Sequence, residues 1–231
     1  MRTMEGAWLS IFVAVLAFSG FGICGFGGLG DASGGQHTWP DSETPWPDST
    51  APSPDSDLDV RQYFNAECED KLNDQIQEEL KASHLYLSMA YYFSRSDVAL
   101  YGFHKFFKKM SDEEREHGQV LMEYVNKRGG TVSMTPSLTF THQNKLQTGN
   151  WDSALHSMKE AMKLEHHVNK HLKEKVHKCA VDHDDAHLQD FIENTFLTEQ
   201  VDSIKELGDY ITKITRLGHG VGLHMFDKEL Q

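Results

Sequence analysis

The hexapeptide DEEREH, residues 112–117, carries the side chains of this sequence that most directly suggest metal chemistry. Glu114 and His117 are three residues apart, so on a helix they share one face and lie about one turn apart. A carboxylate and an imidazole placed in this way can bind one cation. A Glu-x-x-His sequence also arises by chance and usually belongs to a solvated face. A metal site at this hexapeptide would therefore require further ligands from other parts of the chain.

Similar polar residues interrupt the apolar seam of four long helical patterns, each near the middle of its pattern. They are Glu79, the pair Glu114 and His117, Glu165, and Gln200. In a bundle of antiparallel helices, residues at the midpoints meet at one level. Buried, ionised carboxylates cost several kcal/mol each unless a partner compensates them. Three carboxylates at one level therefore indicate a bound cation, and oxygen ligands with one imidazole suit iron or manganese better than zinc.

Tyr86 follows Glu79 by seven residues on the same helix face. Two interpretations remain open. The tyrosine is either a core aromatic whose hydroxyl bonds to one of the carboxylates, which we favour, or a redox-active neighbour of the metal.

The helices that must position these residues are predicted from apolar spacings of three and four residues. The patterns cover about residues 66–94, 97–128, 151–178 and 185–217, and the stretch GLHMFDKEL predicts a fifth, short helix. We expect Asp97 to cap the second helix and Gly129-Gly130 to end it. The predicted fold class is therefore all-α.

The lengths of the connections predict the topology. Short connections make the first and second helices antiparallel, and likewise the third and fourth. About twenty residues without periodicity separate the second helix from the third. Such a segment can extend over about 65 Å, whereas a helix of thirty residues is about 45 Å long. The sequence thus predicts a ferritin-like four-helix bundle with one long crossover.

Composition limits the function. The chain has 231 residues, a formal net charge of -13 and 14 histidines. An acidic chain of this kind lacks the basic surface that phosphate binding requires, so we expect no nucleic-acid partner. The net negative charge favours the binding of cations.

The first 59 residues differ from the rest. Residues 1–30 have the arrangement of a cleaved secretory signal peptide, which predicts a secretory or extracellular location. An uncleaved membrane anchor is the less favoured interpretation, and a mitochondrial transit peptide less favoured still. Residues 31–59 read as a disordered acidic linker rich in Pro, Ser and Asp. Trp39 and Trp46 leave open a docking motif, although a solvated spacer is favoured.

From about Val60 onward the chain resembles a eukaryotic ferritin subunit of the heavy, catalytic type, and secreted invertebrate ferritins most of all. The stretches ASHLYLSMAYYFSR, SDVAL, DEEREH, NKRGG, DFIE, LTEQVDSIKELGDYIT and MFDKEL carry this resemblance. It implies that residues 60–231 form a di-iron domain. This domain would oxidise Fe(II) with dioxygen and store ferric mineral in a 24-subunit cage, alone or with other ferritin subunits.

The resemblance also assigns individual residues. It implies a ferroxidase centre of Glu79, Glu114, His117, Glu165 and Gln200, in which Glu114 bridges two irons and Tyr86 and Glu113 stand nearby. Glu113 and Glu116 would belong to the inner surface where mineral nucleates, at which Gln119 replaces a further acid. Asp190 and Glu193 match the acids of the threefold entry channels.

Two other functions remain as alternatives: a non-catalytic shell subunit that carries iron, and a different di-iron oxidase on the same bundle. The sequence also has one extra residue near Cys179 relative to the family pattern. Cys68 and Cys179 are expected at the same end of the bundle. We favour two buried free thiols over a disulfide.

Overall fold

The computed structural model describes residues 60–134 and 150–231. The predicted leader, the predicted acidic linker and most of the predicted crossover lie outside the described residues. Within them every regular element is a helix, so the predicted all-α fold class is confirmed. No helix in these two ranges is long and apolar enough to cross a membrane.

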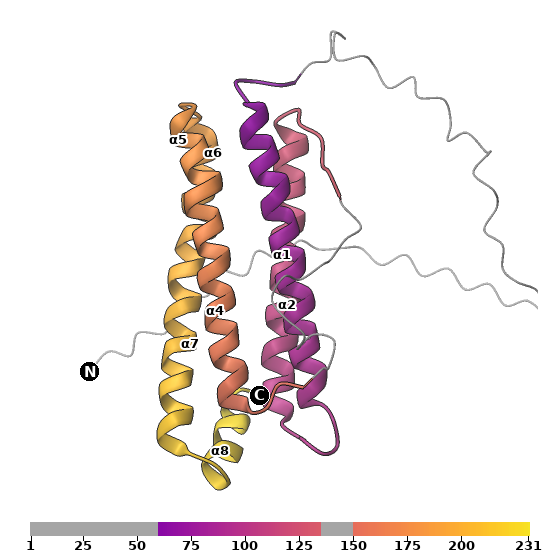
Figure 1. The fold of residues 1–231 in the computed structure, drawn as a ribbon, viewed down its shortest axis with the longest axis vertical. Coiled ribbons are helices and arrows are strands. Elements are labelled where there is room, and N and C mark those ends of the chain that lie inside the picture. Colours follow the sequence, from indigo (N-terminus) through magenta and orange to yellow (C-terminus); the bar gives the residue numbers. More distant parts are fainter. Residues whose placement is uncertain (1–59, 135–149) are drawn as a thin grey trace, which may run out of the picture. The chain divides into compact units, whose positions relative to one another are not determined.

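Two antiparallel pairs of helices form the bundle (Figure 1). Helix α1 (Ala66–Phe93) packs along α2 (Tyr101–Lys127). The second pair consists of two long helices, each with a turn of π-helix. One contains α4 (Ala154–His171), η1 (Leu172–His177) and α5 (Lys178–Asp182), and the other α6 (Ala186–Ile192), η2 (Glu193–Leu197) and α7 (Thr198–Leu217).

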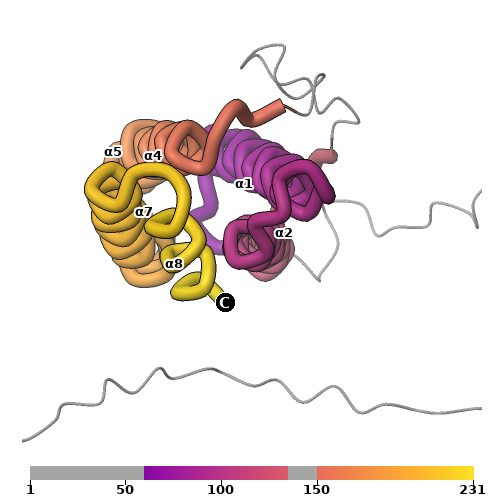
Figure 2. The backbone as a smooth tube through the Cα atoms, turned by 90° about the horizontal axis from the view of Figure 1, so that it is seen from below, coloured from indigo at the N-terminus to yellow at the C-terminus, as the bar shows by residue number. Residues whose placement is uncertain are grey.

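The long helices surround a common axis, and the short helix α8 (Val221–Glu229) lies at the end where α7 finishes (Figure 2). Helices α2 and α4 run in the same direction (Figure 1). The end of α2 and the start of α4 therefore lie at opposite ends of the bundle, in agreement with the predicted topology.

The caps of the helices explain where they begin and end. Gly129 has a φ of 73°, and a Cβ atom there would lie 2.8 Å from the backbone nitrogen of Arg61. Only glycine fits such a left-handed position against another segment of backbone, which confirms the predicted end of α2.

The predicted cap at Asp97 is wrong. Helix α2 begins at Tyr101, and Asp97 pairs instead with Arg95. The carboxylate of Asp227, on α8, accepts hydrogen bonds from the backbone N–H groups of Gly102 at 2.7 Å and Phe103 at 3.1 Å. Asp227, which lies 125 positions from Gly102, thus caps the start of α2 in place of the predicted Asp97.

Cys68 and Cys179 form a disulfide between α1 and α5, so the prediction of two free thiols is wrong. The start of α1 and the end of α5 lie at the same end of the bundle (Figure 1). Their Cα atoms are 5.6 Å apart, within the usual range for disulfides. The π turn η1 precedes Cys179, and its wider loop can hold the extra residue that the sequence shows there.

Candidate metal centre

The middle of the bundle is a polar layer between two apolar clusters. One cluster includes Leu72, Leu121 and Leu188, towards the disulfide, and the other includes Phe93, Phe103 and Phe226, towards α8. The polar side chains of the predicted centre lie between them on the four long helices. Rigid packing on both sides therefore holds this layer in place.

Glu79, Glu114 and His117 converge as the spacing predicts. One possible ligand atom from each side chain lies within 4.8 Å of the others. Glu79 is 0% exposed and Glu114 is 2% exposed, whereas His117 is half-buried. Helix α1 contributes the first residue, and one turn of α2 contributes the other two.

Glu165 of α4 and Gln200 of α7 complete the layer from the other pair of helices. The amide Nε2 of Gln200 donates to Glu165 Oε2 at 2.8 Å, and the hydroxyl of Tyr86 donates to Glu165 Oε1. Both oxygens of Glu165 are thereby oriented. The structure thus contains the predicted hydrogen bond between the Tyr86 hydroxyl and one of the carboxylates.

The carboxylates strongly affect one another. Burial, followed by repulsion from Glu114, raises the pKa of Glu79 well above its ordinary value. Burial and the negative charge of Glu165 likewise raise the pKa of Glu114. Glu114 thus interacts electrostatically with both of the other carboxyl groups. A cation in this layer would relieve the repulsion and release the protons.

His117 is held between two carboxylates. Its Nδ1 lies 3.3 Å from Glu114 Oε2, and its Nε2 lies 3.1 Å from Glu199 Oε2. Burial acts to lower the pKa of His117, but the bond to Glu199 and the nearby carboxylates outweigh it and raise the pKa to about 9. The same contact lowers the pKa of Glu199.

Two buried oxygens indicate where a cation would fit. Among the described residues, Glu79 Oε2 and Gln200 Oε1 are buried and accept no hydrogen bond. Buried acceptors without a partner are rare and costly. Both are oxygen atoms of the predicted ligand set. The residues present therefore suit a cation that prefers oxygen with one nitrogen ligand.

Other residues from the sequence prediction lie outside this layer. Glu113 is paired with Lys109 at 2.8 Å, and Glu116 is exposed. Asp190 and Glu193 are exposed on α6 and η2, where Glu193 accepts from His177 Nε2 at 2.6 Å. The structure brings none of these four acids into contact with Glu79.

Two neighbours of the ligands were not predicted from the sequence. Gln75 donates from Nε2 to Glu79 Oε1 at 2.6 Å, and its own oxygen contacts His171 Nδ1 at 2.5 Å. Glu199 bonds to His117, as described above. Gln75 precedes Glu79 by one turn, a spacing that places it on the same face. The contact between Glu199 and His117 joins α7 to α2, and no local pattern predicts it.

Comparison with known proteins agrees with this geometry. Residues 69–217 match the family model described as a ferritin-like domain. The chain is 51% identical to the soma ferritin of Lymnaea stagnalis over 170 residues, which cover 74% of this chain and 94% of that protein. It is 45% identical to the ferritin-1 heavy chain of Schistosoma mansoni over 174 residues, covering 73% and 94%. This chain therefore belongs to the ferritin family.

Proposed function

We propose that this chain is an iron-storage subunit that oxidises ferrous iron with dioxygen at the polar layer of the bundle. Membership of the ferritin family supports iron storage. The observation that carries the catalytic part is the convergence of Glu79, Glu114 and half-buried His117, with Glu165 buried in the same layer and two buried oxygens that lack a partner. Such a set is costly unless cations occupy it.

Each residue has a specific role in this proposal. Glu114 would bind both ferrous ions, because it interacts electrostatically with both other carboxyl groups. Glu79 and His117 bind one ion, and Glu165 binds the other. Gln200 offers its free Oε1 to the substrate iron, and Tyr86 holds Glu165 in place.

The reaction balances with dioxygen as the oxidant. Two ferrous ions lose one electron each, and these two electrons with two protons convert dioxygen to hydrogen peroxide. The carboxylates stabilise the increase in positive charge as Fe(II) becomes Fe(III). The neutral amide of Gln200 binds the ferric product less strongly than a carboxylate would, so the product can leave for storage.

The proposal extends to assembly and location. We infer a 24-subunit cage in which Glu113 and Glu116 face the mineral and Asp190 and Glu193 line an entry channel. We also infer that residues 1–30 are a cleaved signal peptide, which the disulfide between Cys68 and Cys179 supports, because disulfides persist in oxidising compartments. Mass spectrometry of the mature N-terminus tests the cleavage.

One experiment tests both catalysis and assembly. The purified iron-free protein is mixed with a ferrous salt in air, ferric absorbance is followed, and the product is sized. We expect Glu114→Ala to remove rapid oxidation and to leave the cage intact. Glu123→Ala, an exposed glutamate on the same helix, is the matched control and should oxidise iron normally.

The possible results separate the alternatives. Oxidation no faster than the uncatalysed rate would refute the catalytic function and favour a non-catalytic shell subunit. Elution of the protein as a monomer would refute the cage and favour a different di-iron oxidase. Equal losses in Glu114→Ala and Glu123→Ala would exclude this layer as the reactive site.

A further inference from the structure

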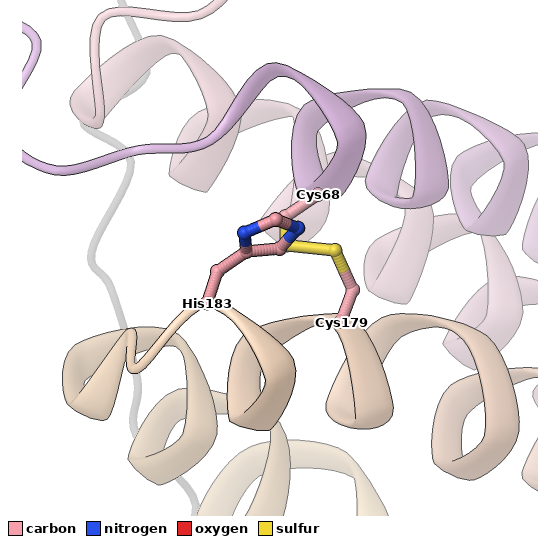
Figure 3. Close-up of side chains that lie close together, drawn as sticks. All are labelled: Cys68, Cys179 and His183. Carbon is pink, nitrogen blue, oxygen red and sulfur yellow. A yellow bond between two sulfur atoms is a disulfide. The ribbon is translucent and has the colours of Figure 1, made fainter.

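A second group of metal-ligating residues lies at the end of the bundle. Cys68, Cys179 and His183 each offer one ligand atom, and these atoms lie within 4.8 Å of one another. The imidazole of His183 stands over the disulfide bond between the two cysteines (Figure 3). Two sulfur atoms and one nitrogen form a ligand set unlike that of the carboxylate centre.

Neighbouring side chains hold His183 in this position. Asn65 caps α1 by accepting from the backbone N–H of Glu67 at 2.8 Å, and its amide contacts His183 Nδ1 at 3.1 Å. The other ring nitrogen, Nε2, lies 3.2 Å from Glu67 Oε2. The amide nitrogen of Asn65 is a donor, so Nδ1 carries the lone pair and Nε2 donates its proton to Glu67. Nδ1 can therefore bind a metal in place of the Asn65 contact while Nε2 keeps its hydrogen bond to Glu67. Metal-binding histidines usually have such an arrangement.

We propose that reduction of the Cys68–Cys179 disulfide opens a second metal site, in which the two thiolates and the His183 imidazole bind a borderline-soft dication such as zinc. Two sulfur ligands and one nitrogen match the preference of zinc and are poor ligands for ferrous iron relative to the carboxylate layer. Three protein ligands leave a fourth, tetrahedral position for water.

The chemistry balances with a dithiol as the reductant. The dithiol supplies two electrons and two protons, so the sulfur–sulfur bond breaks, two cysteine thiols form, and the dithiol becomes a cyclic disulfide. Binding of the dication then forms two metal–sulfur bonds and releases one proton from each thiol. In the reverse direction a cyclic disulfide accepts the two electrons and takes up two protons to become a dithiol, the Cys68–Cys179 bond forms again, and the metal is released.

The surrounding fold can hold the cysteines after reduction. Cys68 is 0% exposed and Cys179 is 5% exposed, and both belong to the apolar cluster at this end of the bundle. A tetrahedral zinc ion with bonds of about 2.3 Å separates its two sulfur ligands by about 3.8 Å. This is close to the contact distance of unbonded sulfur atoms, so side-chain rotation can meet the requirement without moving the helices. The exposed side of His183 gives the cation a path to the site.

Cobalt(II) serves as the probe because thiolate ligands give it an intense charge-transfer absorption, which carboxylate and imidazole ligands do not. The full-length protein is reduced with dithiothreitol without oxygen, the reductant is removed by gel filtration, and Co²⁺ is titrated. We expect one thiolate-bound cobalt per chain in the reduced protein, and loss of the band when zinc is added. The oxidised protein and the double variant Cys68→Ser/Cys179→Ser should show no band.

His183 provides the decisive comparison. Loss of this ligand should weaken cobalt binding by at least about tenfold, because even partners outside the ligand shell usually contribute that much. His84→Ala, which removes an exposed histidine from the middle of α1, is the matched control and should bind like the unmodified chain. Neither variant touches the carboxylate layer, so ferrous oxidation should be unchanged in both.

Three results would overturn the proposal. The first is a reduced, folded protein without a thiolate-to-cobalt band. The second is equal affinity in His183→Ala and His84→Ala, since two unrestrained thiols would then explain the binding. The third is loss of the helical circular dichroism signal on reduction, because the site requires the folded bundle. None of these results depends on whether the carboxylate layer oxidises iron.

Discussion

The two groups of potential metal ligands in this molecule are brought together in the same way but end in different chemical states. In both, helices of the bundle carry residues distant in sequence to one axial level. At the centre, Glu114 repels both Glu79 and Glu165, and one buried oxygen each of Glu79 and Gln200 has no hydrogen-bond partner. At the end of the bundle, Cys68 and Cys179 satisfy each other by a covalent bond. Proximity is therefore insufficient for a metal site, and the chemistry of the side chains decides whether a cation is needed.

The largest effect should come from removing a carboxylate of the central layer. Glu165 is buried and joined to both Tyr86 and Gln200, so Glu165→Ala removes one proposed ligand and leaves two polar groups without their partner. We expect the initial rate of ferrous oxidation to fall by more than about 100-fold. Cobalt binding to the reduced cysteines should be unchanged. A joint loss of both properties would show that the two groups are not independent.

Removing the disulfide should lower the stability of the protein and leave ferrous oxidation nearly unchanged. The bond closes a loop between residues 111 positions apart, so Cys68→Ser/Cys179→Ser should lower the free energy of unfolding by about 2–5 kcal/mol. Chemical denaturation measures this loss. Ferrous oxidation at low temperature should remain within about twofold, since the central layer keeps its contacts. A strong loss of oxidation in a folded variant would contradict the separation of the two groups.

A smaller effect should follow when a neighbour of a ligand is changed. Gln75 orients Glu79 through a 2.6 Å hydrogen bond, so Gln75→Leu should slow ferrous oxidation by about 10-fold. Gln77→Leu is the matched control, because this glutamine lies on the same helix and its amide donates to the Ser133 carbonyl oxygen at 3.3 Å. Equal rates of ferrous oxidation in the two variants would show that Gln75 does not position Glu79.

The smallest expected effect is a pH dependence of stability, which the central carboxyl groups should cause and the disulfide should not. Burial and Glu165 raise the pKa of Glu114 above its ordinary value of 4.5 in the folded protein. The folded state therefore binds this proton more tightly than the unfolded state. That contribution is complete below pH 4.5 and is lost as the pH rises through the higher folded pKa.

We therefore expect the iron-free chain to lose stability relative to Glu114→Gln as the pH rises above about 4.5. Thermal unfolding of both iron-free proteins over a range of pH measures the difference. The disulfide does not titrate, so combining either protein with Cys68→Ser/Cys179→Ser should lower both curves equally. A difference independent of pH would mean that folding does not change the protonation of Glu114.

The sequence alone determined the helices and the level of the central layer. Helical periodicity is local, and by itself it places Glu79, Glu114, His117, Glu165 and Gln200 in the seams of four helices. The crossover length was enough to predict that α2 and α4 run in parallel. These results follow because spacing along one chain segment decides which face of a helix a residue occupies.

Only the tertiary structure decided how distant segments are paired. It replaced Asp97 by Asp227 as the cap of α2, joined Cys68 to Cys179, and placed Glu199 against His117. Each of these contacts joins different helices, and it depends on their rotation and axial position to within about an ångström. The spacing of residues along one segment does not determine the rotation and axial position of a helix to that precision. The packing of complete helix faces against one another does.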